Sequence, residues 1–514
     1  MRQATLGVCV SVLLACGDSG GEPTAGEASE TGETPGSTST GEAPTTSGEP
    51  STGGTSIAGS TSTGGESTST SAGESTTGDE TSTGEVVVDI EVALNGVAGL
   101  TWEEQASDIE GYRFFLLYYQ QPADHDDPDG LQFTQHMMLH HRDAAAPTVI
   151  STDGYYIYPW YQALSEPASL LHANQLIVEH RWFADSRPEP ADWTLLTIEQ
   201  SAADHHRITT ALQDAIYHAP WVATGVSKGG MTASYFRRFY PADVAATVSY
   251  VAPLSFAVED PRYWPYLEGI DPPCEAKLKD YRRELLLRRD EMLGRIADEA
   301  LQNDYTYDFL DQEHALEVTA LNVSWGFWQY GGDKCADVPG VVATDDELWD
   351  FLQEISPVSD LRDARLEAFE PYYFQAAVQL GAPKTDETAL ADLLVFPGFD
   401  VAPSYVSPGP TKDMTYDPAA MQDIKTWMAE EATAMLFVYG ERDPWSGGAY
   451  EADPTHDVHK FVAPGNNHGS KVADLTEEDR AVAYERLEAW TGVKPVSRPF
   501  PPELPLRVRL RLLP

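Results

Sequence analysis

Apolar runs bounded by turn residues recur along the chain from about residue 86 onward. The run at 86–92 is rich in β-branched residues, and residues 112–121 and 133–141 have the lengths and spacing of a strand hairpin. Four later runs have the continuous apolar character of strands buried on both faces: 147–152, 174–180, 221–225 and 245–251. Helix-favouring stretches at 197–217 and 228–240 alternate with strands. The pattern therefore predicts an α/β fold with a mostly parallel sheet that helices cover on both faces.

The pattern changes between residues 256 and 433, where charged segments typical of helices replace the apolar runs. Examples are 275–303 and 345–354, and a block of this length is too long to be a loop. Strand-like runs and an amphipathic helix then return, at 434–439, 458–463 and 475–490. We therefore expect a helical lid, 256–433, inserted into a main domain that is formed by 86–255 and 434–514.

The first 85 residues differ in composition from the rest of the chain. Residues 1–16 contain an arginine, a mostly apolar run and a cysteine, and they are too short for a permanent transmembrane helix. Their ending, LLAC, is typical of a bacterial lipobox, with an ordinary signal peptide as the alternative. Residues 17–85 have no lysine, arginine or aromatic residue, which predicts a disordered stalk. We expect an exported bacterial lipoprotein of the cell envelope or surface, anchored through acyl chains on Cys16.

Acidic residues outnumber basic residues by 81 to 33, which gives the chain a formal net charge of −48 at pH 7. A nucleic acid or an anionic membrane surface would be repelled, so we expect neither as a partner. The charge is instead typical of the solvated surface of an exported protein. Hydrophobic residues make up 42% of the chain, which is enough for at least one large core.

Two of the four cysteines, Cys9 and Cys16, lie in the export segment, and Cys274 and Cys335 remain for the folded part. An even pair in an oxidising compartment predicts one disulfide, which would stabilise the fold by about 3–4 kcal/mol according to loop-entropy reasoning. Two unpaired thiols are the alternative. The two cysteines lack the close spacing of a zinc site.

The sequence GVSKG occupies residues 225–229, directly between an apolar strand and a helix pattern. In this context the motif G-x-S-x-G forms a nucleophile elbow, a strained turn that exposes a serine at the edge of an α/β-hydrolase sheet. Small residues are required on both sides because the turn presses the backbone against its neighbours. We therefore interpret Ser227 as a nucleophile, with an ordinary turn as the alternative.

An acid and a histidine follow the serine in the order that α/β-hydrolases use. Asp443 comes just after the strand-like run 434–439, and His468 comes after the run 458–463. Parallel strands place the loops that follow them at one edge of the sheet. The alternatives are a turn-forming Asp-Pro pair and a solvated loop histidine. The order predicts a catalytic triad in which His468 removes the proton of Ser227 and Asp443 orients the imidazole.

A serine hydrolase also needs two backbone N–H groups that face the developing oxyanion. One is expected from Lys228, directly after the nucleophile. The other is expected from the loop after the run 147–152, at Gly154 or Tyr155. We expect the side chain of Lys228 itself to be exposed or salt-bridged rather than catalytic.

Further motifs occur in order along the chain: QPADH at 121–125, VEHRWF at 178–183, LTIEQ at 196–200, SKGGMT at 227–232, YGERDPW at 439–445 and NHG at 467–469. Together they resemble the secreted tripeptidyl aminopeptidases of the PS-10 serine peptidase family, relatives of the prolyl carboxypeptidase and dipeptidyl peptidase II group. The resemblance implies an α/β-hydrolase that releases short peptides from free N-termini, often with proline before the scissile bond. We expect such a peptidase to need no cofactor.

An exopeptidase must pair the substrate ammonium with a buried carboxylate or amide. The position of Glu199 and Gln200 in a family-like block suggests them for this role, while the alternative for Glu199 is that it only begins a helix. Trp445, with Trp325 and Trp328, is a candidate for a proline-accepting pocket, and the alternative for these aromatic residues is core packing.

Two other functions use the same features. A lipase or carboxylesterase would need the same triad, and a surface binding protein would keep the fold without the activity. The acidic stretch at 124–130 lacks the ligand register of a calcium loop, and the chain has no HExxH motif, so we expect no metal. Peptides are the expected partners, and the oligomeric state is not set by the sequence.

Overall fold

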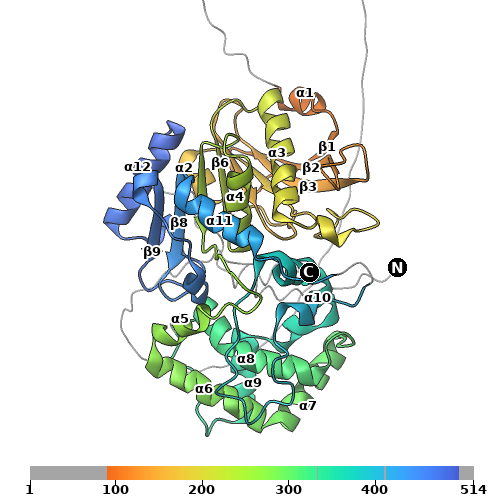
Figure 1. Cartoon of the computed structure of the whole chain (residues 1–514), viewed down its shortest axis with the longest axis vertical. Coiled ribbons are helices and arrows are strands. Elements are labelled where there is room, and N and C mark those ends of the chain that lie inside the picture. Colours follow the sequence, from red (N-terminus) through yellow and green to blue (C-terminus); the bar gives the residue numbers. More distant parts are fainter. Residues whose placement is uncertain (1–88, 333, 410–412, 497–514) are drawn as a thin grey trace, which may run out of the picture. The chain divides into compact units, whose positions relative to one another are not determined.

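The computed structural model describes residues 89–332, 334–409 and 413–496, which belong to one compact unit. The predicted signal peptide, Cys16 and the predicted stalk lie outside the described residues. The centre of the unit is one sheet with the strand order β1-β2-β3-β5-β4-β6-β7-β8-β9 (Figure 1). The strands are β1 Leu100–Gln105, β2 Arg113–Pro122, β3 Gln132–His141, β4 Thr148–Thr152, β5 Asn174–Val178, β6 Trp221–Val226, β7 Ala246–Tyr250, β8 Met435–Gly440 and β9 Val458–Ala463.

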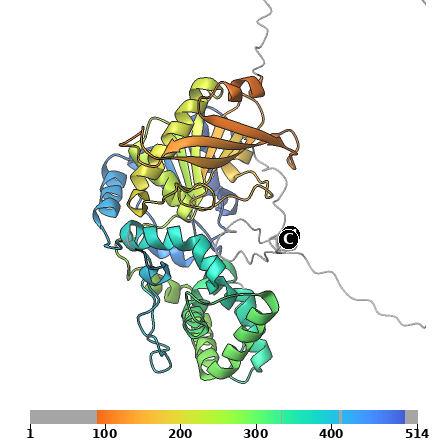
Figure 2. The same cartoon turned by 90° about the vertical axis from the view of Figure 1, so that its right-hand side faces the viewer.

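The sheet is antiparallel at one edge and parallel elsewhere. Strands β1, β2, β3 and β5 pair antiparallel, and the orange strands of this edge face the viewer in Figure 2. All pairs from β5 through β4 to β9 are parallel. Every residue of β7 and β8 is buried, as expected for strands that helices cover on both faces. The predicted α/β fold with a mostly parallel sheet is confirmed.

Helices pack on both faces of this sheet. Apolar residues of α3 and α4 pack on one face together with α1, and residues of α2 and α12 pack on the other. Helix α11 also packs on the sheet, through a core that includes Trp427 and Phe437. These helices are α1 Ile90–Asn95, α2 Glu166–Leu171, α3 Ile198–Ala215, α4 Lys228–Phe239, α11 Ala419–Glu430 and α12 Glu477–Thr491.

The strand-like interpretation of residues 86–92 is wrong where the structure describes it, because α1 begins at Ile90. The side chain of Asp89 caps this helix by accepting hydrogen bonds from the backbone N–H groups of Glu91 and Val92. Ile90 and Leu94 lie one turn apart and are both buried. The cap and this helical spacing outweigh the β-branched composition of the segment.

The chain between β7 and β8 is helical and has a core of its own (Figure 2). Its helices before α11 are α5 Tyr263–Ile270, α6 Pro272–Leu287, α7 Arg289–Asn303, α8 Gln312–Tyr330, α9 Asp345–Ile355 and α10 Asp363–Gln375. The stretch 275–303 therefore forms parts of two helices, separated at Arg288. A disulfide joins Cys274, in α6, to Cys335, with their Cα atoms 5.7 Å apart.

Short helical turns connect these elements. They are η1 Trp193–Leu195, η2 Val358–Leu361, η3 Ala376–Leu380, η4 Ala402–Tyr405, η5 Pro444–Gly448, η6 Pro454–His456 and η7 Val472–Asp474. No helix within the described ranges has the length and apolar character that crossing a bilayer requires.

Candidate active site

Ser227 occupies the sharp turn between β6 and α4. Its backbone has φ 55° and ψ −124°, a strained conformation for a residue with a side chain. The turn is so tight that a Cβ atom on Gly225 would overlap the carbonyl group of Gly229. Such close backbone packing explains why glycine stands at both positions. The serine therefore has the geometry of a nucleophile elbow.

Asp443 and His468 meet at the same edge of the sheet, in the loops that follow β8 and β9. Both residues are almost completely buried, and Nδ1 of His468 lies 2.7 Å from Oδ2 of Asp443. The other carboxylate oxygen of Asp443 accepts the backbone N–H of Trp445 at 3.1 Å. The backbone N–H of His468 donates to the carbonyl of Gln329, at the end of α8, over 3.1 Å. The helical insertion therefore contacts the histidine loop directly.

The second ring nitrogen of His468 is the one that a general base would use. Nε2 is buried and has no hydrogen-bond partner among the described residues. Two aromatic rings lie near the imidazole, that of Tyr330 at 6.1 Å and that of Trp445 at 6.3 Å, measured between ring centroids. The structure thus joins Asp443 to His468, while a hydrogen bond between His468 and Ser227 is not formed. Such catalytic bonds often tighten only when substrate is bound.

The loop after β4 packs directly on the elbow. Gly154 has φ +85°, and a Cβ atom there would lie 2.6 Å from the backbone nitrogen of Gly229. The hydroxyl of Thr152 donates to the carbonyl of Gly229 over 2.7 Å. Within the described residues, the backbone N–H groups of Lys228 and Tyr155 have no hydrogen-bond partner. The amide of Lys228 and that of Tyr155, one of the two candidates in the loop after β4, thus come from segments that are in contact.

The side chain of Lys228 differs from its expectation, because it is neither exposed nor salt-bridged. Lys228 is only 2% exposed, and its Nζ donates to the carbonyl of Gly154 over 2.7 Å. The same nitrogen lies over the rings of Tyr155 and Phe183, at 5.6 and 5.4 Å from their centroids. Burial holds the pKa of this ammonium well below its ordinary value, although the carboxylate of Asp153 opposes that shift.

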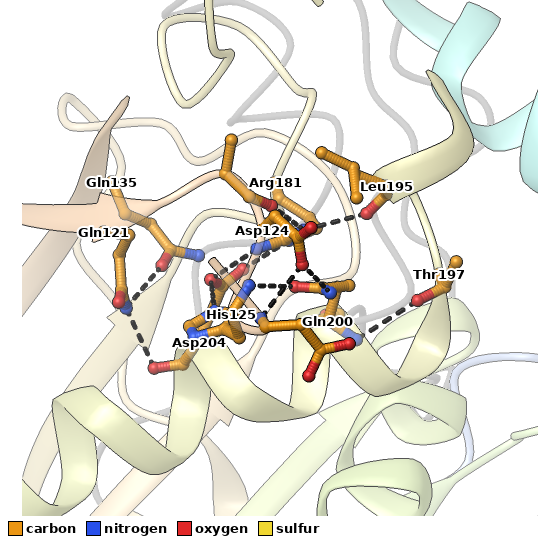
Figure 3. Close-up of polar contacts among 12 residues, drawn as sticks. Gln121, Asp124, His125, Gln135, Arg181, Leu195, Thr197, Gln200 and Asp204 are labelled. Atoms are coloured by element: carbon orange, nitrogen blue, oxygen red, sulfur yellow. Dashed lines mark hydrogen bonds and ion pairs between the residues drawn. The ribbon is translucent and has the colours of Figure 1, made fainter. Parts of the chain in front are cut away.

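Glu199 and Gln200 do not provide the buried, available group that an ammonium would need. Glu199 is exposed in the first turn of α3, as its helix-start alternative requires. Both ends of the Gln200 amide are already used, as Figure 3 shows. Its Nε2 donates to Asp124 and its Oε1 accepts the backbone N–H of His125, each over 2.9 Å. Glu199 and Gln200 therefore do not have the expected role of binding the substrate ammonium.

The chain as a whole matches a known family and a known relative. The model of a family described as PS-10 peptidase S37 matches residues 84–503. A prolyl tri/tetrapeptidyl aminopeptidase of Streptomyces mobaraensis is 41% identical over 417 residues, which cover 79% of this chain and 86% of the relative. The chain belongs to the PS-10 peptidase S37 family. This S37 peptidase is a serine peptidase, as the resemblance of its motifs implies.

Solved structures similar to the S37 peptidase are remote in sequence. A proline iminopeptidase of Mycobacterium smegmatis is 14% identical, with a TM-score of 0.35, and covers 76% of this chain and 99% of its own. A peroxisomal α/β-hydrolase of Saccharomyces cerevisiae is 11% identical, with a TM-score of 0.31, and covers 79% of this chain and 96% of its own. The parallel sheet and the serine elbow of the S37 peptidase are those of an α/β-hydrolase.

A buried polar network in the S37 peptidase joins two of the motifs, through His125 and Arg181, to Asp204 in α3 (Figure 3). Arg181 and Asp204 are fully buried and share two hydrogen bonds, of 2.7 and 2.8 Å. Nε2 of His125 lies 2.7 Å from the same carboxylate. Burial raises the pKa of Asp204, but Arg181 and His125 more than offset it and leave that pKa below its ordinary value. Sequence reasoning missed this network, although charged residues within apolar motif blocks were a signal for it.

Of the three tryptophans, Trp445 lies beside the candidate base. Its ring packs against that of Trp325, with the ring centroids 5.0 Å apart. Trp328 is buried in the insertion core and donates to Glu275 over 3.2 Å, so it is a core residue. In the acidic stretch, Asp124 accepts from Gln200 and from the backbone of Asp126. Throughout the described part of the chain, no cluster of His, Cys, Asp or Glu is arranged to hold a metal ion.

Proposed function

We propose that this S37 peptidase removes short peptides, chiefly tripeptides, from free N-termini through an acyl-enzyme, with a preference for proline before the scissile bond. The observation that carries the proposal is the buried Asp443–His468 pair, 2.7 Å apart, at the sheet edge where Ser227 forms its strained turn. The name of the Streptomyces mobaraensis relative, a prolyl tri/tetrapeptidyl aminopeptidase, supports the substrate class.

The proposed reaction uses the triad in two steps. Nε2 of His468 takes the proton from Ser227 as Oγ attacks the scissile carbonyl, and Asp443 stabilises the imidazolium through Nδ1. The imidazolium then gives its proton to the leaving amine, the C–N bond breaks, and the acyl-enzyme remains. In the second step His468 takes a proton from water as its oxygen attacks the ester carbonyl. The C–O bond to Ser227 then breaks, His468 gives the proton back to Oγ of Ser227, and the peptide leaves with a new carboxyl group. The backbone N–H groups of Lys228 and Tyr155 bind the oxyanion in both steps.

The proposal also gives the insertion and Trp445 a role in binding. Gln329 and Tyr330, at the end of α8, lie against His468, and the ring of Trp445 lies near its imidazole. In this proposal residues 256–433 act as a lid over the site. The apolar face of Trp445 would accept the proline ring of the substrate, because proline packs well on flat aromatic surfaces.

A peptide panel tests the function. The purified full-length protein is assayed with chromogenic di-, tri- and tetrapeptides whose N-termini are either free or blocked, and with a short-chain ester. We expect turnover of free tripeptides, little turnover of blocked ones, and loss of at least about 10³-fold in Ser227→Ala. Ester turnover without peptide turnover would indicate an esterase. Turnover that survives in Ser227→Ala would refute the triad, and turnover of nothing would favour a binding protein.

We also propose that the peptidase is an exported lipoprotein anchored through Cys16, on the basis of the LLAC sequence at the end of the apolar leader. A Cys16→Ala variant expressed in a bacterium is expected to lose the protein from the membrane fraction and to lose incorporation of labelled fatty acid. Unchanged membrane association without fatty-acid labelling of the parent protein would contradict the anchor.

A further inference from the structure

The environment of the Lys228 side chain is unusual for a lysine. The residue is 2% exposed, and its ammonium nitrogen makes one hydrogen bond, to the carbonyl of Gly154. No carboxylate lies within salt-bridge distance of it among the described residues. The aromatic rings of Tyr155 and Phe183 lie beside it, and the carboxylate of Asp153 interacts with it from beyond hydrogen-bond distance. Burying an amine in this way is costly, and an apolar side chain of similar length would pack there without that cost.

The single hydrogen bond of Lys228 falls on the peptide group that joins Gly154 to Tyr155. In a trans peptide the C=O and N–H groups point in opposite directions. A donor that holds the Gly154 carbonyl therefore also fixes the direction of the Tyr155 N–H group. That N–H group has no partner of its own among the described residues and belongs to the loop that packs on the elbow.

The loop needs such a restraint because of its own backbone. Gly154 has φ +85°, a region that glycine enters as readily as the ordinary one, so the sequence alone does not prevent rotation of the following peptide. The contact between Gly154 and Gly229 fixes where the loop lies. The hydrogen bond from Lys228 then fixes which way its peptide faces.

We propose that the side chain of Lys228 is a positioning residue, which orients the Tyr155 N–H group of the oxyanion hole by holding the carbonyl of Gly154. This inference rests on the proposed function, because it assigns the two amides to the oxyanion of that reaction. One residue then supplies the first donor with its backbone and orients the second with its side chain. The side chain of Lys228 does not touch the reacting atoms.

The test compares Lys228→Met, which keeps the length and removes the donor, with Lys228→Gln, which keeps an N–H donor on a shorter chain. Both are made in the full-length protein and assayed with a free chromogenic tripeptide. We expect Lys228→Met to lower kcat by about 10- to 100-fold with KM nearly unchanged, and Lys228→Gln to recover part of that loss. The affinity for a tripeptidyl boronic acid, whose tetrahedral oxygen occupies the oxyanion hole, should fall by the same factor as kcat/KM.

A packing control separates positioning from stability. Leu212→Ala removes buried apolar contact in α3, away from the loop, and should lower the melting temperature while kcat and boronate affinity stay within about 2-fold. An unchanged kcat in Lys228→Met would overturn the proposal. So would a raised KM with unchanged kcat, or a lowered kcat with unchanged boronate affinity. If neither Lys228 variant folds, the residue is part of the folding core and not a positioning residue.

The Ser227→Ala variant distinguishes failure of the proposed function from failure of the role proposed for Lys228. If Ser227→Ala keeps full turnover, the triad itself is refuted. If Ser227→Ala is inactive while Lys228→Met has full kcat, only the role of Lys228 is refuted.

Discussion

The two oxygens of the Asp443 carboxylate have different partners, and together these partners fix the candidate base. Oδ2 lies 2.7 Å from Nδ1 of His468, and Oδ1 accepts the backbone N–H of Trp445. The carboxylate therefore ties the imidazole to the backbone of η5. A carboxylate at this position accepts a hydrogen bond from a protonated Nδ1. Nε2 then carries no proton and can accept the proton of Ser227.

Asp443→Asn is expected to lower kcat by about 10³- to 10⁴-fold while the protein stays folded. The amide can donate to Nδ1, which favours the imidazole tautomer with its proton on Nε2, and that tautomer cannot accept the serine proton. Steady-state kinetics with the free tripeptide measures the loss, and circular dichroism reports on the fold. A variant that retains more than about a tenth of the parent kcat would contradict the assignment of Asp443.

Glu179 holds two loops near the site from a buried position. Its carboxylate accepts the backbone N–H of Ile157 over 3.0 Å and the hydroxyl of Ser186 over 2.7 Å. Burial raises the pKa of Glu179 to about 7, although these hydrogen bonds oppose the shift. The folded protein therefore binds this proton more tightly than the unfolded chain does. Stability from this group is fully present below pH 4.5 and is lost as the pH rises through about 7.

Glu179→Gln removes that titration. The free energy of unfolding of the parent should fall relative to that of the variant by about 2 kcal/mol between pH 5 and pH 8. Urea denaturation of both proteins at several pH values measures the difference, and any constant offset reports the changed hydrogen bonds. A difference that does not vary with pH would show that Glu179 does not titrate in this range.

Single residues also show what the sequence does not reveal. Lysine is almost always exposed, so the buried position of Lys228 is set by partners such as Gly154, which lies 74 positions away. Gln200 belongs to a motif block, yet its amide is bound by Asp124 and His125 and not available to a ligand. Motif position identifies residues that matter, but contacts decide which of them face a substrate.

At the scale of elements, the prediction from sequence was most successful where burial was most complete. The four apolar runs at 147–152, 174–180, 221–225 and 245–251 correspond to β4, β5, β6 and β7, because strands covered on both faces carry an unmistakable pattern. The short segment that forms α1 was misread, since six residues hold too few turns to show a helical period. Strand β1 was not predicted, because most of its residues are exposed.

The elbow between β6 and α4 leaves no space for a side chain at Gly225. Gly225→Ala would place a methyl group on the Gly229 carbonyl, so we expect a loss of at least about 3 kcal/mol in stability and a large loss of activity. Gly294→Ala, in the interior of α7 with open space around it, is the matched control and should be neutral or slightly stabilising. Thermal unfolding and tripeptide turnover measure both. Equal effects of the two substitutions would contradict the close packing of the elbow.

At the scale of the whole molecule, the net charge of −48 gives the protein a strong negative field. Such a field attracts cationic substrates and repels anionic ones over distances comparable to the Debye length, about 8 Å at physiological ionic strength. The sequence made this property visible without any structure, since it depends on composition more than on contacts.

The field should sort peptide substrates by charge. For a free tripeptide that carries lysine, kcat/KM is expected to fall several-fold when NaCl is raised from about 20 mM to about 500 mM. A matched peptide with glutamate should show an unchanged or higher kcat/KM over the same range. Initial rates at low substrate concentration measure both. The same salt response for the two peptides would show that the field does not reach the site.

The hydrogen bond between the backbone N–H of His468 and the carbonyl of Gln329 also limits how freely the helical insertion can be exchanged between related enzymes. Gln329 lies in the insertion, which a protein engineer would exchange to transplant specificity from one relative to another. A chimera that takes the insertion alone would place the end of α8 from one parent against the histidine loop of the other. A successful graft must therefore end α8 at the position where its last carbonyl groups can still accept the backbone N–H of His468.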